Sequence, residues 1–162
     1  SNGLPTGRPG VGIYRATGRL VGDNRIEANG RNGVEVNQGA LFQGKGDFFN
    51  LTAGPDRIEG NPRHGISAFN GATLDIQNAI INGNGRNGIS LPLNSSLRIR
   101  NSTVSGNARF GIGLELHSGV LFDDPPASVV GNTQAQVACR ESTSKYDGNL
   151  SGVGQPIFCT AF

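Results

Sequence analysis

The feature that most constrains the fold is a turn motif that recurs along the chain at a nearly fixed interval. The pattern is Asn, any residue, Arg, any residue, Gly, then Val or Ile, and it occupies residues 29–34, 61–66, 84–89 and 107–112. A weaker copy at residues 6–11 keeps the Arg and the Gly, and a degenerate copy covers residues 131–137. Successive glycines lie 23, 32, 23 and 23 residues apart, and they are Gly10, Gly33, Gly65, Gly88 and Gly111. A period of this length predicts a solenoid, in which each repeat packs only on its neighbours.

Apolar residues keep fixed places relative to the glycine of each copy. One place after the glycine, the column reads Val11, Val34, Ile66, Ile89 and Ile112. Three places after it, the column reads Ile13, Val36, Ala68, Leu91 and Leu114. Steps of two are typical of a strand with one buried face, and each copy holds about three such strands. No copy can close a core alone, so we expect the copies to stack as coils.

The composition agrees with a chain of short strands and tight turns. There are 26 glycines and many asparagines, both of which tolerate left-handed backbone conformations, and only 35% of the residues are hydrophobic. No apolar run approaches 18 residues, so we expect no insertion into a membrane. The net charge of +2 and the low aromatic content do not favour nucleic acid as a partner.

Three segments carry a resemblance to a known group of proteins: IINGNGRNGISL (80–91), VSGNARFGIGLEL (104–116) and IEGNPRHGISA (58–68). They resemble the repeats of the right-handed parallel β-helix proteins of the pectate-lyase-like superfamily, over residues 5–137. The resemblance implies an all-β fold, a single right-handed parallel β-helix of about six to seven coils of 23 residues. That architecture hosts lyases, hydrolases, epimerases, phage spikes and plain surface proteins, so it does not choose a function.

The repeat also predicts how the chain is divided. We assign residues 1–137 to the coils, with an insertion loop at residues 43–56 inside the long interval, and residues 138–162 to a C-terminal cap. The only cysteines, Cys139 and Cys159, lie near the two ends of this cap. Either they form a disulfide, which we expect and which implies an oxidising compartment, or they are two free buried thiols. We therefore expect a secreted, periplasmic or cell-surface protein.

The N-terminal end is the less protected end of the predicted solenoid. The chain begins at Ser1 without Met, and we take this as a sign that an upstream segment has been removed, from a mature secreted protein or from an excised domain. No obvious cap covers the first coil. Because open strand edges pair readily, either further coils precede this end or it mediates self-association.

The asparagine column and the glycine column of the turn have a structural interpretation. The asparagines Asn29, Asn61, Asn84 and Asn107 would stack at about 4.8 Å, where side-chain amides can bond to the turns above and below. The glycines would supply either a backbone angle or a clearance that a Cβ forbids.

A third column carries positive charge and is the candidate binding site. Five arginines occupy one place in successive copies, and they are Arg8, Arg31, Arg63, Arg86 and Arg109. Like charges about 5 Å apart repel by about 1 kcal/mol per pair in water, so some compensation is expected. One source is internal: Glu27 and Glu59 precede two of the arginines by four residues, and guanidinium groups can stack on one another. The other source is an acidic polysaccharide or another surface polymer bound along the arginine ladder.

Candidates for catalysis are few. The fragment RHG at residues 63–65 is similar to the His-Gly motif of polygalacturonases, and FDD at residues 122–124 is similar to their paired aspartates. The companion NTD-like element is absent and the order of the two motifs is reversed. The weak candidates are therefore His64, His117, Asp123 and Asp124, and the structural interpretation of each as a turn or surface residue is preferred. We expect no metal site and no cofactor.

The sequence thus favours a non-catalytic secreted or surface module that is structural, binds an anionic polysaccharide, or both. The alternatives are a polysaccharide lyase, hydrolase or epimerase of the same superfamily, and a spike or scaffold unit joined through its open end. Six or seven coils make a rod of only about 30 Å, which is short for an enzyme with a walled cleft.

Overall fold

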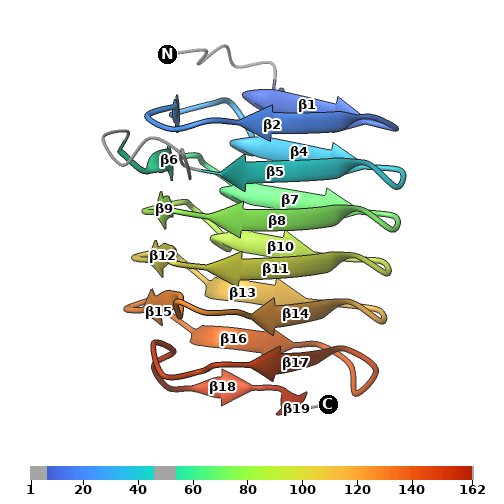
Figure 1. Ribbon diagram of the computed structural model, residues 1–162, viewed down its shortest axis with the longest axis vertical. Coiled ribbons are helices and arrows are strands. Elements are labelled where there is room, and N and C mark those ends of the chain that lie inside the picture. Colours follow the sequence, from blue (N-terminus) through green and yellow to red (C-terminus); the bar gives the residue numbers. More distant parts are fainter. Residues whose placement is uncertain (1–6, 46–53, 162) are drawn as a thin grey trace.

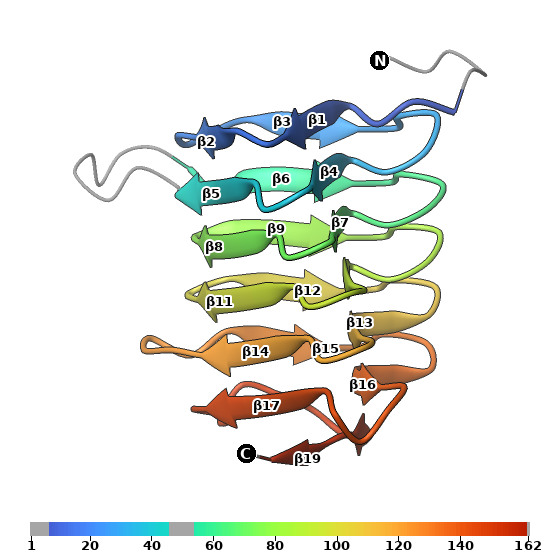
Figure 2. The same cartoon turned by 90° about the vertical axis from the view of Figure 1, so that its right-hand side faces the viewer.

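The computed structural model describes residues 7–45 and 54–161, and these form one parallel β-solenoid of about six turns. The first five turns each contribute one strand to each of three sheets, and the C-terminal winding adds strands to only two of them. No helix occurs in the described part of the chain (Figure 1). Viewed from the N-terminal end, the coils turn clockwise as they move away, which makes the solenoid right-handed (Figure 1 and Figure 2). The described residues contain no helix able to span a lipid bilayer. The predicted fold class is confirmed.

The three sheets form three faces of the solenoid, and the third ends before the C-terminal strands of the other two (Figure 1 and Figure 2). The first sheet contains β1 (Val11–Tyr14), β4 (Val34–Asn37), β7 (Ile66–Phe69), β10 (Ile89–Leu91), β13 (Phe110–Leu114), β16 (Ala135–Cys139) and β18 (Ile157–Phe158). The second sheet contains β2 (Thr17–Leu20), β5 (Leu41–Lys45), β8 (Thr73–Gln77), β11 (Ser96–Arg100), β14 (Gly119–Phe122), β17 (Lys145–Gly148) and β19 (Thr160–Ala161). The third sheet contains β3 (Arg25–Glu27), β6 (Asp56–Glu59), β9 (Ala79–Asn82), β12 (Thr103–Ser105) and β15 (Ser128–Val130).

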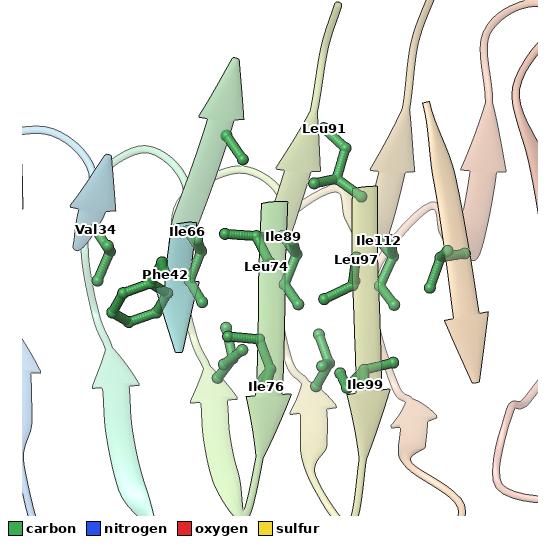
Figure 3. Close-up of a cluster of buried hydrophobic side chains, with 14 of the residues drawn as sticks. Val34, Phe42, Ile66, Leu74, Ile76, Ile89, Leu91, Leu97, Ile99 and Ile112 are labelled. Atoms are coloured by element: carbon green, nitrogen blue, oxygen red, sulfur yellow. The ribbon is translucent and has the colours of Figure 1, made fainter. Parts of the chain in front are cut away.

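Strand register follows the columns that the repeat defines. Ile66, Ile89 and Ile112 are direct partners in neighbouring strands, and Val34 and Val137 extend the same file. These residues are fully buried, as are the facing columns of the second sheet (Figure 3). Complete burial of such a side chain contributes about 1.5–3 kcal/mol, so the stacked columns are the main source of cohesion.

The asparagines form the expected ladder. In each rung the backbone N–H and the side-chain Nδ2 of one asparagine donate to Oδ1 of the next, at 2.8–3.1 Å. The ladder continues one coil beyond the predicted column, and its members are Asn29, Asn61, Asn84, Asn107 and Asn132. At its end the side chain of Gln136 accepts from Asn132, so the last rung is capped within the same turn.

The repeated glycines supply clearance and not a backbone angle. A Cβ on Gly88 would lie 2.5 Å from Cγ1 of Val104 and 2.9 Å from the carbonyl oxygen of Gly111. The left-handed positions belong instead to other glycines of the same turn, such as Gly83 (φ +61°) and Gly106 (φ +61°). The coils therefore approach so closely at this corner that only hydrogen fits.

The C-terminal segment continues the winding after the sequence repeat has faded. Strand β17 pairs with β14, and β18 pairs with β16, so residues beyond 139 add to the first two sheets. Cys139 and Cys159 form the expected disulfide, with their Cα atoms 4.9 Å apart. Of the predicted insertion loop at residues 43–56, residues 46–53 lie outside the described part of the chain.

Candidate functional site

The arginine-bearing turn links the third sheet to the first, and hydrogen bonds between its backbones align successive coils. The N–H of Arg63 donates to the carbonyl of Arg31 at 3.1 Å, Arg86 to Arg63 at 2.8 Å, and Arg109 to Arg86 at 3.1 Å. In the next coil the same place is taken by Gln134, whose N–H donates to Arg109 at 2.9 Å. Four arginines therefore share one position in consecutive turns. Arg8 is exposed on the first coil.

These four arginines line a groove along the outer face of the first sheet, with a volume of about 510 Å³. The arginines lie before the strands, and an apolar bank of Phe69, Pro92 and Leu93 lies at or just after the ends of the strands. We call this surface the sheet groove. Its lining residues are Arg31, Asn32, Arg63, His64, Ser67, Phe69, Arg86, Asn87, Ser90, Pro92, Leu93, Arg109, Phe110, Glu115 and Arg140.

The base of the sheet groove is polar yet buried. Ser67 and Ser90 line it, and Glu35 continues their row one coil toward the N-terminus, beside the lining residues. All three occupy the outward place between two inward apolar residues of their strands. In register, Glu35 is the partner of Ser67, and Ser67 is the partner of Ser90. Each is no more than 7% exposed. Their outward direction and low exposure together show that neighbouring side chains, not the core, cover them.

A carboxylate is held at the N-terminal end of this surface. Glu35 accepts a hydrogen bond from the Tyr14 hydroxyl at 2.8 Å and another from Nδ2 of Asn32 at 3.0 Å. The hydrogen bond to Glu35 raises the pKa of the Tyr14 hydroxyl, because the phenol proton is held between the two groups. Both carboxylate oxygens thus have partners, and this end of the sheet groove is less positive than its middle.

His64 lies in the middle of the sheet groove and is neutral at pH 7. Burial lowers the pKa of its imidazole to about 4, helped by the positive charges of the four arginines around it. Its Nδ1 accepts from the backbone N–H of Asn87 at 3.3 Å, so the proton of the neutral ring is on Nε2. The ring therefore presents a donor and not a base to the groove.

The four groove arginines form no ion pair with the described residues. Glu27 and Glu59, which the sequence suggested as their partners, instead pair with Arg25 and Arg57 on their own strands. Arg109 lies over the ring of Phe110, 5.4 Å from its centroid. At the C-terminal end, Arg140 pairs with Glu115 at 2.9 Å. The uncompensated positive charge is thus concentrated between these two ends.

The catalytic candidates do not come together. His64 belongs to the sheet groove, whereas His117 is exposed in the turn after β13 with φ +62°. Asp123 follows β14 in the second sheet, where it binds Arg98 and, at 3.2 Å, Arg100. Hydrogen bonding to Arg98 lowers the pKa of the Asp123 carboxyl.

The remaining candidate, Asp124, accepts a hydrogen bond from Nδ2 of Asn149 at 2.7 Å. Within the described residues, no group of three or more His, Cys, Asp or Glu side chains is arranged to hold a metal ion. The arrangement around the sheet groove can bind and orient an anion through guanidinium groups, and the carboxylate in its lining, Glu115, is ion-paired with Arg140.

Three residues in or beside the sheet groove were not singled out from the sequence. The residues two places after the repeat glycine, Glu35, Ser67 and Ser90, stand out only as a polar column between two apolar ones. The alternation predicts that this column faces outward, and an outward strand face is usually solvated, so no signal in the sequence indicated that these side chains are buried. Only the side chains of the adjoining turn explain why this one is covered.

Comparison of the chain with protein-family models, with curated proteins and with solved structures finds no match. The parallel solenoid agrees with the fold that the repeat resemblance implies, and membership of the pectate-lyase-like superfamily stays a prediction.

Proposed function

We propose that the sheet groove binds a linear anionic polymer, first of all an acidic polysaccharide, without acting on it chemically. The observation that carries the proposal is that Arg31, Arg63, Arg86 and Arg109 line one groove and have no carboxylate partner among the described residues. Neighbouring guanidinium groups on adjacent coils repel one another, by about 1 kcal/mol per pair in water and more near a protein surface. A bound polyanion relieves this repulsion.

The repeat distance supports a polymer over a single small anion. Parallel strands lie about 4.8 Å apart, so the groove offers one guanidinium per coil at that interval. One unit of an extended sugar chain has a similar length, and carboxylates along it can each take a bidentate contact from arginine. In this arrangement the arginine column acts as a charge ladder for the ligand.

The opposite bank of the groove suits a sugar. Phe69, Pro92 and Leu93 line it with apolar surface, which can pack on the C–H faces of pyranose rings. Nucleic acid is a weaker fit, since the net charge is only +2 and aromatic residues make up 6% of the chain. The disulfide supports a secreted, periplasmic or cell-surface location, where such polymers occur.

A binding titration with salt dependence tests the proposal. The probes are a polyuronate, heparin and neutral dextran, measured by calorimetry against the wild type, the double variant R63Q/R86Q and the control R98Q. We expect the acidic polymers to bind, to weaken as salt rises, and to lose on the order of tenfold or more in affinity in the double variant. R98Q should bind as the wild type does, because Arg98 belongs to the second sheet.

Two results would overturn the proposal. One is equal affinity for dextran and the acidic polymers. The other is a double variant that is folded and binds the acidic polymers as tightly as R98Q does.

A further inference from the structure

We propose that Asn87 makes the sheet groove selective for an anion that carries a free hydroxyl beside its acidic group, as an acidic sugar does, over a bare anion such as polyphosphate. This inference rests on the proposed function of the groove and adds a criterion for its ligand. The decisive group is the side-chain oxygen of Asn87, an acceptor in a groove otherwise rich in donors.

The lining of the sheet groove contains two buried polar atoms without a partner among the described residues, Nε of Arg31, which is a donor, and Oδ1 of Asn87, which is the acceptor. Asn87 is 5% exposed and lines the sheet groove, yet its Oδ1 is buried and has no hydrogen-bond partner in the described part of the chain. Buried acceptors without a partner are rare because they lose water without gaining a replacement. The same burial closes Oδ1 to solvent in the unliganded groove, so a ligand donor pairs with it once the side chains that cover it are displaced.

Asn32, the matching residue two coils earlier, shows that the repeat does not by itself leave this side-chain oxygen without a hydrogen-bond partner. Asn32 occupies the same place in its copy, and its Nδ2 donates to Glu35 while its Oδ1 accepts from the backbone N–H of His64 at 3.3 Å. On the strand that follows Asn87, the place of Glu35 is taken by Ser90. The missing partner is therefore a local property of the groove centre.

The position of Asn87 is fixed by the coils on both sides. Its backbone N–H donates to Nδ1 of His64 in the preceding coil, at 3.3 Å. Its side chain packs over Gly113 in the following coil, where an added Cβ would lie 2.6 Å from Nδ2. The absence of a side chain at Gly113 thus leaves the room that the Asn87 amide occupies.

The surroundings of Asn87 decide which ligand satisfies it. The guanidinium groups of Arg63, Arg86 and Arg109 and the Nε2–H of His64 are donors only. A bare polyanion is an acceptor only, so it can pair with these donors but leaves Oδ1 of Asn87 unpaired. A sugar hydroxyl next to a carboxylate supplies the missing donor, and a site built for a hydroxyl discriminates against ligands that lack one.

The test compares three probes on three proteins. The probes are an oligouronate, the same oligosaccharide with its hydroxyls methylated, and polyphosphate of matched charge. The proteins are the wild type, N87L, and the control N82L, which makes the same substitution on the third sheet outside the groove. Far-UV circular dichroism and a thermal melt verify that each variant is folded.

We expect the wild type and N82L to prefer the unmodified oligosaccharide over both other probes by about three- to tenfold. N87L should lose that preference and keep its salt-dependent binding, because the arginines are intact. If N87L is as selective as N82L, or if the wild type binds all three probes equally, the inference is wrong and the groove proposal stands. If the wild type binds none of the probes, the proposed function fails first. Since methylation of the ligand removes the donor without any mutation, a wild type that binds the methylated and unmodified oligosaccharides equally overturns the inference even where N87L is poorly folded.

Discussion

Asn84 accepts two hydrogen bonds from Asn61 through a single side-chain oxygen, from the backbone N–H at 3.1 Å and from Nδ2 at 2.9 Å. Its own Nδ2 donates to the carbonyl of Ile58 at 3.2 Å and to the side chain of Asn107 at 2.9 Å. One buried side chain thus joins three coils, at the corner where the backbone leaves the sheets.

The first prediction concerns this rung. Replacing Asn84 by Ala strips partners from several buried polar groups at once, and we expect the free energy of unfolding to fall by about 3–5 kcal/mol. The control is Asn82→Ala, which lies two residues earlier at the outward-facing end of β9 and should cost less than about 1 kcal/mol. Urea denaturation measures the free energy of unfolding of both variants. Equal losses would show that the hydrogen bonds of the ladder add no more stability than a partly exposed asparagine does.

The second prediction separates clearance from backbone angle. Gly88→Ala introduces a Cβ within 2.9 Å of backbone and side-chain atoms of the next coil, and we expect a loss of about 2–4 kcal/mol from overpacking. Gly83→Ala meets no atom within 4 Å but keeps a left-handed angle, so it should cost only about 1–2 kcal/mol. Thermal melts of the two variants rank them, and a larger loss for Gly83→Ala would contradict the role assigned to the repeat glycine.

The third prediction concerns the stability of the unliganded groove. Arg86→Gln removes a positive charge that has no ion-pair partner among the described residues, so the free energy of unfolding should stay the same or rise by up to about 1 kcal/mol. Arg100→Gln is the comparison, since Arg100 donates to Gln77 at 3.0 Å and to Asp123 at 3.2 Å, and its loss should lower stability by about 1 kcal/mol. Chemical denaturation without ligand checks both. A larger loss in Arg86→Gln than in Arg100→Gln would mean that the groove arginine is structurally compensated.

The fourth prediction follows from the lowered pKa of His64. The unfolded chain takes up a proton on this ring near pH 6.5 and the folded chain only near pH 4, so protons favour the unfolded state between these values. Stability should therefore fall by up to about 3 kcal/mol from this residue as pH drops from about 6.5 to about 4, and change no further below that.

The variant that tests it is His64→Asn, which introduces the residue found at this place in two other copies, Asn32 and Asn87. Unfolding measured at pH 7 and pH 4.5 should show a smaller acid loss in this variant than in the wild type. His117→Asn, in an exposed turn, is the control and should keep the wild-type profile. Identical acid losses in all three proteins would show that His64 is not shielded from protonation.

The fifth prediction concerns the C-terminal disulfide. Cys139 and Cys159 are 20 residues apart, and closing a loop of that size stabilises the folded state by about 3 kcal/mol in the chain-entropy description. The double variant C139S/C159S should lose about that much in urea denaturation, and reduction of the wild type should do the same. An unchanged midpoint after verified reduction would show that pairing of β18 with β16 holds the end without the bond.

Much of the fold was predictable because its signals repeat. A place such as that of Ile66, Ile89 and Ile112 is apolar in every copy, and in a parallel stack like places become direct neighbours. The asparagine ladder follows from the same logic, as does the strand register. The sequence did not predict that β17 and β18 continue the first two sheets, because the repeat fades after residue 137. The pairing of these strands depends on backbone hydrogen bonds and not on matching side chains.

The candidate site was predictable only in part. The sequence placed the four groove arginines at one position in consecutive coils, and the backbone hydrogen bonds between them agree. The sequence suggested the wrong partners for Glu27 and Glu59, because residues four apart along a turn need not meet. Arg25 and Arg57 lie two residues before these carboxylates, on the same face of the strand, and pair with them instead. The sequence did not single out Glu35, whose burial comes from side chains of the adjoining turn.

The sequence by itself determined the period, the apolar columns and the stacking that they require, because regular spacing along a chain becomes regular spacing along the solenoid axis. Only the tertiary structure decided which charges are paired, which outward side chains are covered, and that the oxygen of Asn87 lacks a partner while that of Asn32 has one. These properties depend on distances between side chains of different coils and on the few residues that break the repeat, and neither is encoded in the repeat itself.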